Sequence, residues 1–189
     1  MGIIVSFNQN PMVSPYQKIK SVIDKASQLP HVDKKTVEVF LRRLHEGKLI
    51  RDENPEDHFC VFFVPFYKET RQIFLGHHKK ANDWIPPGGH IEQNETLIEA
   101  VKREAKEELG FEITNEKIEL FNINSLDVSH PSRPCKIHHH VWYILFMNKF
   151  ENFNHTQKEF YDAKWFSLKE ALKRIRIPVY RKTIQKLLF

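Results

Sequence analysis

Residues 89–111 hold carboxylates at a spacing that suits chemistry at a phosphate group. The segment begins at Gly89, places Glu95 six residues later, and ends with the run Arg103-Glu-Ala-Lys-Glu-Glu-Leu-Gly-Phe. If the run is helical, Glu104, Glu107 and Glu108 occupy an arc of roughly 100°. Adjacent carboxylates repel and raise one another's pKa. A hard divalent cation such as Mg²⁺ or Mn²⁺ relieves that repulsion and keeps waters for substrate phosphates.

The residues around these carboxylates predict a helix over residues 96–109. Apolar residues recur at helical spacing along it, and Thr96 with Glu99 has the spacing of a capping box. Gly110 is a suitable stop, because glycine enters the left-handed conformation without steric cost. Glu108 overlaps the apolar stripe, so a purely structural helix would partly bury a carboxylate there. Arg103 lies four residues before Glu107, where it can hold that carboxylate.

A solvated, salt-bridged helix face is the alternative explanation for such a charged run. The residues upstream argue against it. The sequence PPGG at residues 86–89 predicts a tight turn at the end of an apolar segment, and glycine lets a backbone carbonyl approach a ligand closely. Seven fixed residues at fixed spacing arise by chance on the order of once in a million.

The spacing G-x5-E-x7-R-E-x-x-E-E-x-G followed by an apolar residue resembles the motif of the Nudix hydrolase family, and every position matches. The chain resembles the family more loosely over about residues 49–166. In this region it is similar to a bacterial-type subgroup with an N-terminal helical extension. The resemblance implies an α+β fold, an α/β/α sandwich with a mixed sheet between helices. We expect residues 1–52 to form a helical extension and residues 53–189 to form the Nudix domain.

The resemblance also implies a Mg²⁺- or Mn²⁺-dependent pyrophosphohydrolase acting on a nucleoside diphosphate derivative. Glu104, Glu107 and Glu108 are then metal ligands, with the Gly89 carbonyl as a fourth. Arg103 orients a carboxylate, and Glu95 braces the loop. The general base is either Glu104 or, by analogy with later-loop glutamates in the family, Glu159.

Residues outside the motif are candidates for binding substrate. Lys79 could hold phosphates, as could Lys80, Arg133 and Lys136, although each alone is typical of a solvated surface charge. Trp84 could stack on a base or pack beneath the loop. Several histidines fall in or near the same segments: His77, His78, His90, His130 and the run His138-His139-His140.

These histidines fit three interpretations. On a strand His138 and His140 share one face, where they could line a substrate pocket together with His90. They could instead be packed in the core. Zinc is the third interpretation, but no cysteine or carboxylate completes a spaced ligand set in the sequence.

The overall composition is that of an ordinary globular protein. The chain has 189 residues, 41% hydrophobic and 28% charged, with a formal net charge of +5. This charge favours anionic ligands without demanding nucleic acid. Cys60 and Cys135 make neither a disulfide framework nor a zinc site on their own, and their apolar contexts predict core packing. With no membrane span and no secretory signal in the sequence, we expect a cytoplasmic protein with no membrane partner.

The rest of the chain predicts alternating strands and helices. We expect a hairpin of two helices, beginning at Ser14-Pro15 and at Asp33, that serves as a lid, as a homodimer contact or as packing on the main domain. We expect strands over residues 59–66, 72–77, 118–128, 136–147 and 163–166, and a helix capped by Ser167.

Two other functions are consistent with the sequence. One is hydrolysis at the triphosphate or capped end of RNA, which predicts a larger basic surface and a steep salt dependence. The other is a Nudix-fold nucleotide-binding regulator without catalysis, although such proteins usually lose part of the glutamate cluster that is whole here.

Overall fold

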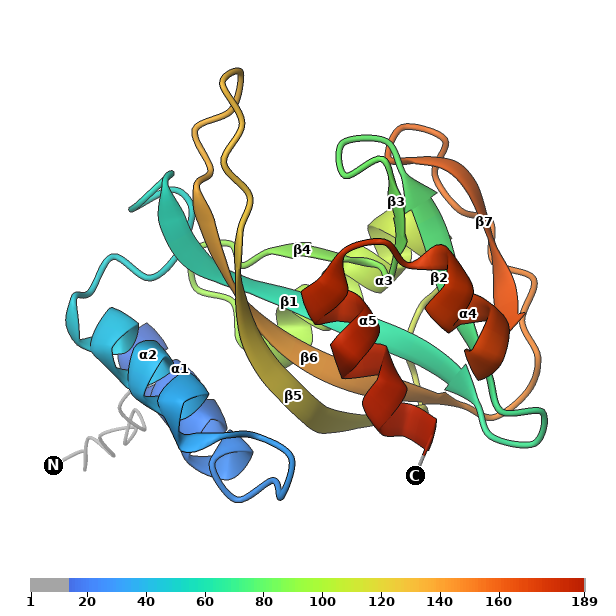
Figure 1. The fold of residues 1–189 in the computed structure, drawn as a ribbon, viewed down its shortest axis with the longest axis horizontal. Coiled ribbons are helices and arrows are strands. Elements are labelled where there is room, and N and C mark those ends of the chain that lie inside the picture. The colour runs from blue at the N-terminus through green and yellow to red at the C-terminus, as the bar shows by residue number, and fades with distance from the viewer. Residues whose placement is uncertain (1–13, 189) are drawn as a thin grey trace, which may run out of the picture.

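The computed structural model describes residues 14–188, which form one mixed sheet of seven strands between helices (Figure 1). The strands are β1 (Asp57–Tyr67), β2 (Gln72–His78), β3 (Asp83–Ile85), β4 (Gly88–His90), β5 (Lys117–Asp127), β6 (Ile137–Met147) and β7 (Phe160–Ser167). The helices are α1 (Pro15–Ala26), α2 (Lys34–His45), α3 (Leu97–Leu109), α4 (Leu168–Arg174) and α5 (Pro178–Gln185), followed by a 3-10 turn, η1 (Lys186–Leu188).

The sheet has the order β3-β2-β1-β6-β5, with β4 paired to β1 and β7 paired to β2. Only β1 and β6 are parallel. β1 and β2 pair only near their connecting turn, at Phe66 with Ile73 and Tyr67 with Gln72. Beyond that turn the two strands separate, and β4 pairs with β1 instead. This splay gives the glycine-rich segment its place beside the centre of the sheet.

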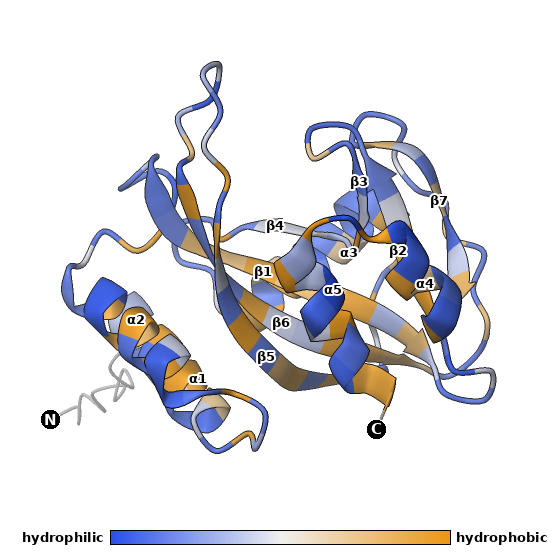
Figure 2. Ribbon diagram, viewed as in Figure 1, coloured by the Kyte–Doolittle hydropathy of each residue, from blue (hydrophilic) through white to orange (hydrophobic). Residues whose placement is uncertain are grey.

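Both faces of β1 are buried, and alternate side chains belong to two hydrophobic cores. Figure 2 shows apolar residues along the central strands of the sheet. Phe59, Val61 and Phe63 belong to the core shared with α1, α2 and α3. Phe62 and Val64 belong to the core shared with α4 and α5 on the other face. In Figure 1, α4 and α5 lie in front of the sheet and α3 lies behind it. The expected α+β sandwich with a mixed sheet is therefore confirmed.

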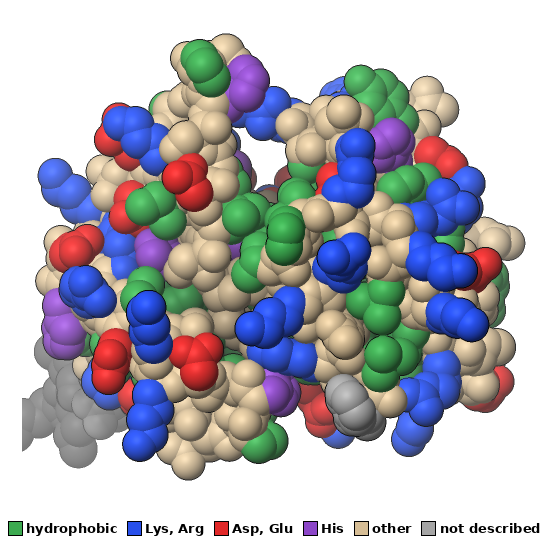
Figure 3. Space-filling view, viewed as in Figure 1, with side chains coloured by type: hydrophobic (Ala, Val, Ile, Leu, Met, Phe, Trp, Pro, Cys, Tyr) green, Lys and Arg blue, Asp and Glu red, His purple; other side chains and the backbone are tan. Residues whose placement is uncertain are grey.

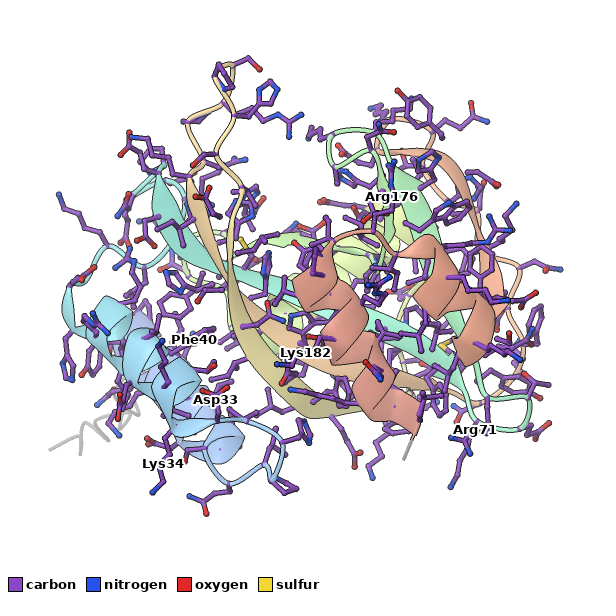
Figure 4. The ribbon with its side chains drawn as sticks, viewed as in Figure 1. Asp33, Lys34, Phe40, Arg71, Arg176 and Lys182 are labelled. Carbon is purple, nitrogen blue, oxygen red and sulfur yellow. The ribbon has the colours of Figure 1, made fainter. Side chains whose placement is uncertain are left out.

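The N-terminal helices pack on the main domain. Phe40 of α2 is fully buried and makes an edge contact with Phe59 of β1, at 5.6 Å between ring centroids (Figure 4). Arg43 is 3% exposed and donates from Nε to Asp57 Oδ1 at 2.8 Å. Its other guanidinium nitrogens donate to the carbonyls of Gly47 and Lys48. Of the three alternatives for this hairpin, the structure shows packing on the sheet.

Buried Asp83 fixes the helices on the opposite face. Its carboxylate is 2% exposed and accepts hydrogen bonds from the backbone N–H groups of Arg176 and Ile177, at 2.8–3.0 Å (Figure 4). These N–H groups lie in the connection that leads into α5, where a helix start leaves donors without partners. Asp83 therefore holds the α4–α5 connection against the start of β3.

Most of the expected elements and caps are confirmed within two or three residues. Ser14, Thr96 and Ser167 each form a capping box, and Asp33 caps α2. The prediction of a tight turn at residues 86–89 was wrong. Gly88 and Gly89 lie in β4, because only residues 86–87 connect it to β3. No helix within residues 14–188 has the length and apolar content needed to cross a bilayer.

Candidate active site

The glutamate cluster lies on α3, whose ends are fixed by local sequence. The helix begins after the Thr96–Glu99 capping box and ends at Gly110, which adopts φ 60° in the left-handed region. Glu104 and Glu108 face inward and are 9% and 5% exposed. Glu107 lies on the outer edge with its side chain 59% exposed. The predicted burial of a carboxylate at Glu108 is confirmed.

Two glycines of β4 let these carboxylates approach the sheet. The Gly88 N–H donates to Glu108 Oε2 at 2.7 Å. A Cβ atom on Gly88 would lie 2.2 Å from the Val61 carbonyl oxygen, and one on Gly89 would lie 2.1 Å from Glu104 Oε1. Real Cβ atoms do not approach other heavy atoms so closely. Gly89 is therefore required by the contact between β4 and the helix, whereas Gly88 is required by its close approach to β1 and by its φ of 149°.

Arg103 connects the carboxylates at the start of the cluster. Its guanidinium donates to both oxygens of Glu95, at 2.7 and 3.1 Å, and to Glu104 Oε1 at 2.8 Å. The contact with Glu107 is longer, at 3.3 Å, and a further bond at 2.8 Å reaches the His90 carbonyl. Arg103 therefore holds Glu104 and Glu95 more closely than Glu107, the partner expected from helical spacing. Glu95 also accepts from the Glu92 N–H and braces the loop before α3, as expected.

Burial shifts the pKa values of the two inward carboxylates, Glu104 and Glu108. Desolvation raises the pKa of Glu108 well above its ordinary value, and the neighbouring Glu104 raises it further. Desolvation also raises the pKa of Glu104, although Arg103 opposes the shift. Burial alone would lower the pKa of Arg103, but its bonds to Glu95 and Glu104 raise it. The carboxylate oxygens of Glu104 and Glu108 repel each other, and a hard divalent cation between them would relieve this repulsion. Glu107 could join them as a ligand if its side chain turned inward.

Glu159 lies on the loop that precedes β7, close to the end of α3. Its carboxylate lies 3.5 Å from His78 Nε2 and 3.3 Å from Lys80 Nζ. The loop is fixed to the helix because the Thr156 N–H donates to the Glu108 carbonyl at 2.8 Å. The negative charge of Glu159 also contributes to the raised pKa of Glu108. The structure thus brings this distant glutamate to the rim of the cluster.

Two predicted substrate residues lie near this loop or on β3. Lys79 donates from Nζ to the Gln157 carbonyl, and its own N–H donates to the Glu159 carbonyl. Trp84 stacks on His77 with ring centroids 5.3 Å apart, and Lys164 and Arg174 lie over its ring. Arg133 donates to the Lys80 carbonyl at 2.9 Å, so the β5–β6 connection meets the β2–β3 connection. Figure 3 shows the surface hollowed between these two connections.

The three strand histidines lie in different surroundings. His140 is 1% exposed, stacks on Phe62, and has both ring nitrogens 3.3 Å from polar partners, Asn124 Oδ1 and Tyr180 Oη. His139 faces the other core, with Nε2 2.9 Å from Asp57 Oδ1. His138 and His90 instead meet each other, with ring centroids 5.3 Å apart.

Two partners of these histidines were not predicted from the sequence. His58 of β1 lies 4.9 Å from both His90 and His138, measured between ring centroids. Cys135 lies beside His58, with Sγ 4.0 Å from Nε2. The statement that no cysteine completes a ligand set was therefore wrong. The sequence pattern that could have indicated Cys135 is the pair C-x2-H at residues 135–138, which is too short to predict a site by itself.

Comparison with known proteins identifies the family. The NUDIX domain model matches residues 57–187. The m7GpppN-mRNA hydrolase NUDT17 of Bos taurus is 31% identical over 72 residues, which are 36% of this chain and 24% of that protein. The curated relatives are thus matched over less than a quarter of their length.

Solved structures share the fold. The E. coli dihydroneopterin triphosphate pyrophosphohydrolase superposes with a TM-score of 0.59 at 17% identity, over 68% of this chain and 92% of that one. A NUDIX-family hydrolase from Clostridium perfringens gives a TM-score of 0.51 at 28% identity, over 69% and 95%. With its complete motif at residues 89–111 and a family match over most of its length, the chain belongs to the Nudix family.

Proposed function

We propose that the protein is a divalent-metal-dependent hydrolase that cleaves a pyrophosphate bond in a nucleoside diphosphate derivative. One observation carries the proposal: two buried carboxylates, Glu104 and Glu108, converge on the glycine strand β4 while Arg103 holds one of them. Burying two carboxylates side by side is costly unless a cation compensates them. A surface helix with a purely structural role gains nothing from this arrangement.

Glu104, Glu107, Glu108 and the Gly89 carbonyl would hold Mg²⁺ or Mn²⁺. The bound cation neutralises phosphate charge and lowers the pKa of a coordinated water. Arg103 acts as a positioning residue, because its bonds to Glu95 and Glu104 fix the carboxylate that faces Gly89. Glu107, which is exposed, is free to turn toward the cation when substrate arrives.

A general base must accept the proton of the attacking water. Glu104 is one candidate, because burial raises its pKa and makes its carboxylate a better proton acceptor. Glu159 is the other, because its loop places it at the rim of the cluster, within 3.5 Å of His78. We propose that the substrate phosphates bind near Glu159, beside Lys79 and Trp84. His90, His138 and His140 were also predicted to bind substrate, but His140 is buried and the other two meet each other.

The test is hydrolysis of a panel of nucleoside diphosphate derivatives with Mg²⁺ and product identification. We expect Glu108→Gln to lower kcat/KM by about 10²- to 10³-fold on the best substrate. Glu112→Gln is the matched control, since Glu112 is exposed just beyond the helix. Absence of hydrolysis across the panel, or full activity of Glu108→Gln, would refute the proposal. Nucleotide binding without hydrolysis would point to a regulator.

A second candidate function is pyrophosphate hydrolysis at the 5′ end of RNA. It is favoured by three matched relatives that carry the name m7GpppN-mRNA hydrolase, although each is matched over less than a quarter of its length. A capped oligonucleotide in the panel distinguishes the candidates. RNA substrates require contacts with several phosphates, so kcat/KM would fall steeply with salt. A homodimer and a cytoplasmic location stay predictions.

A further inference from the structure

Four side chains outside the glutamate cluster gather their ligand atoms in one place. His58, His90, Cys135 and His138 each offer one nitrogen or sulfur atom, and these atoms all lie within 4.8 Å of one another. They come from four segments: β1, β4, the connection before β6, and β6 itself. We propose that these residues bind a zinc ion, separate from the cation held by the glutamates.

Strand pairing brings the ligands together. In the parallel β1–β6 pair, His58 lies directly opposite His138. In the antiparallel β1–β4 pair, His90 lies opposite Cys60, two residues along the same face from His58. Cys135 is held nearby because the N–H of the next residue, Lys136, donates to the Glu56 carbonyl at 2.8 Å. The positions of the ligands are therefore fixed by backbone hydrogen bonds.

The ring nitrogens are arranged as zinc ligands require. His58 Nδ1 lies 2.8 Å from the Asn54 carbonyl oxygen, to which it donates its proton. The lone pair is then on Nε2, the atom that faces Cys135 Sγ. Zinc-bound histidines commonly make such a bond to a backbone carbonyl. The Nε2 atoms of His90 and His138 are buried without a hydrogen-bond partner. Buried polar atoms rarely stay unpaired, so these two nitrogens need a ligand.

The chemistry of this set selects zinc over magnesium. Three imidazoles and one thiolate match the nitrogen and sulfur ligands of tetrahedral zinc, whereas magnesium requires oxygen. Zn–N and Zn–S bonds of about 2.0–2.3 Å place tetrahedral ligand atoms about 3.3–3.7 Å apart. The 4.0 Å between Cys135 Sγ and His58 Nε2 therefore closes by a few tenths of an ångström. Ligand atoms as far apart as 4.8 Å have to approach each other by about 1 Å, which rotation of the side chains allows.

One contact must change when zinc binds. Arg51 Nη1 lies 3.4 Å from His90 Nδ1, which must carry a proton when Nε2 binds the metal. The guanidinium cannot donate to a protonated nitrogen, so it has to turn away. Arg51 is half-exposed, and the contact is at the limit of a hydrogen bond, so its loss costs little.

Four protein ligands leave no open position on a tetrahedral ion, so the site is structural. It ties the connection at residues 128–136 to β1 and β4. That connection also carries Arg133, which meets the β2–β3 connection across the hollow described above. The ion would therefore hold one wall of the hollow in place. This inference does not depend on the hydrolase proposal.

The experiment measures zinc and cobalt binding to the full chain by equilibrium dialysis in excess Mg²⁺, which occupies oxygen sites. We expect one zinc per chain with sub-micromolar affinity and a rise in Tm on binding. Cobalt should give the absorption of a tetrahedral site with a thiolate-to-cobalt charge-transfer band. Cys135→Ser should abolish that band and weaken zinc binding at least 100-fold. His138→Gln should weaken zinc binding similarly.

Two matched controls test which residues are ligands. Cys60→Ala removes the other thiol, and His130→Gln removes an exposed histidine on the same connection. Both should retain the cobalt spectrum and the zinc affinity. If the wild-type protein shows no thiolate-to-cobalt band, or if Cys135→Ser retains it, the proposal is overturned. The wild-type spectrum decides the question even if a ligand variant fails to fold.

Discussion

Replacing Gly89 with alanine tests the contact between β4 and α3 directly. The new Cβ would lie 2.1 Å from Glu104 Oε1 and 2.7 Å from its carboxyl carbon. Because such contacts are not seen below 3.0 Å, the carboxylate has to move by about 1 Å. A displacement of this size in catalytic machinery costs about 10²-fold in rate, equivalent to about 2.7 kcal/mol. We therefore expect kcat/KM to fall about 100-fold.

The same substitution should change stability only slightly. Gly89 does not have a positive φ, so its backbone accepts an alanine without strain. Alanine also restricts the unfolded chain, which stabilises the protein by about 0.4–1 kcal/mol. This gain partly offsets a weakened bond between Glu104 and Arg103, worth about 1.5–3 kcal/mol. The free energy of unfolding in urea should stay within about 2 kcal/mol of wild type.

Gly47→Ala is the matched control. Gly47 has φ 70° with no atom within 4 Å of an added Cβ, so alanine there introduces backbone strain and no clash. We expect a loss of about 1–2 kcal/mol in stability and an unchanged kcat/KM. The reasoning is refuted if folded Gly89→Ala retains kcat/KM within about twofold of wild type on the best substrate of the panel. In that case the close approach of Glu104 to β4 has no role in activity.

Three further predictions concern other residues. Arg43→Met should lower the free energy of unfolding in urea by about 2–4 kcal/mol, because the half-buried Asp57 carboxylate and the carbonyls of Gly47, Lys48 and Asp57 lose their donor; a loss under 1 kcal/mol would contradict this. Glu159→Gln should lower kcat at least tenfold with little change in KM if Glu159 is the base, and an unchanged kcat would exclude it. Burial lowers the pKa of His78 to about 4 and that of His140 below its ordinary value. Their folded forms stay neutral while the unfolded chain takes up protons near pH 6.5, so these histidines lower stability from pH 6.5 to about 4, by up to about 3 kcal/mol for His78. The raised pKa values of Glu104 and Glu108 act in the opposite direction, so the test is the stability difference between wild type and His78→Gln, and a difference that does not change between pH 7 and pH 4 would contradict this.

Local sequence was enough to predict α3. Its caps depend on residues three apart, and its inward carboxylates follow from the 3.6-residue period, so no long-range contact is needed. Glu104 and Glu108 are consequently found where they were expected. The role of Arg103 was only partly predictable. Its spacing indicated Glu107, but the loop that returns Glu95 to the helix gives Arg103 a closer partner.

The prediction at residues 86–89 failed because glycine has two uses in a chain. A turn requires glycine for its backbone angles, and a close approach requires it for its missing side chain. The sequence PPGG is consistent with both. Only the pairing of Gly88 with Phe62 and of Gly89 with Val61 shows that the segment is a strand. Such pairing joins residues far apart in the chain, so the local pattern could not reveal it.

The histidine and cysteine cluster shows the same limit more strongly. His58, His90 and His138 are separated by 32 and 48 residues, and no local spacing relates them. They meet because β1 pairs with β6 on one side and with β4 on the other, with one register for each pair. A shift of either pair by one residue would turn its histidine to the opposite face of the sheet. The cluster is thus a property of the sheet.

The strand β4 connects the two candidate metal sites. Successive side chains of a strand point to opposite faces, so the position of Gly89 faces Glu104 while His90 faces His58 and His138. The His90 carbonyl also accepts a bond from Arg103, which holds Glu104. An ion on the histidine face would therefore restrain the residue next to Gly89, and with it the backbone that contacts the glutamates. Because three residues form this strand, neither face can shift along β1 without moving the other.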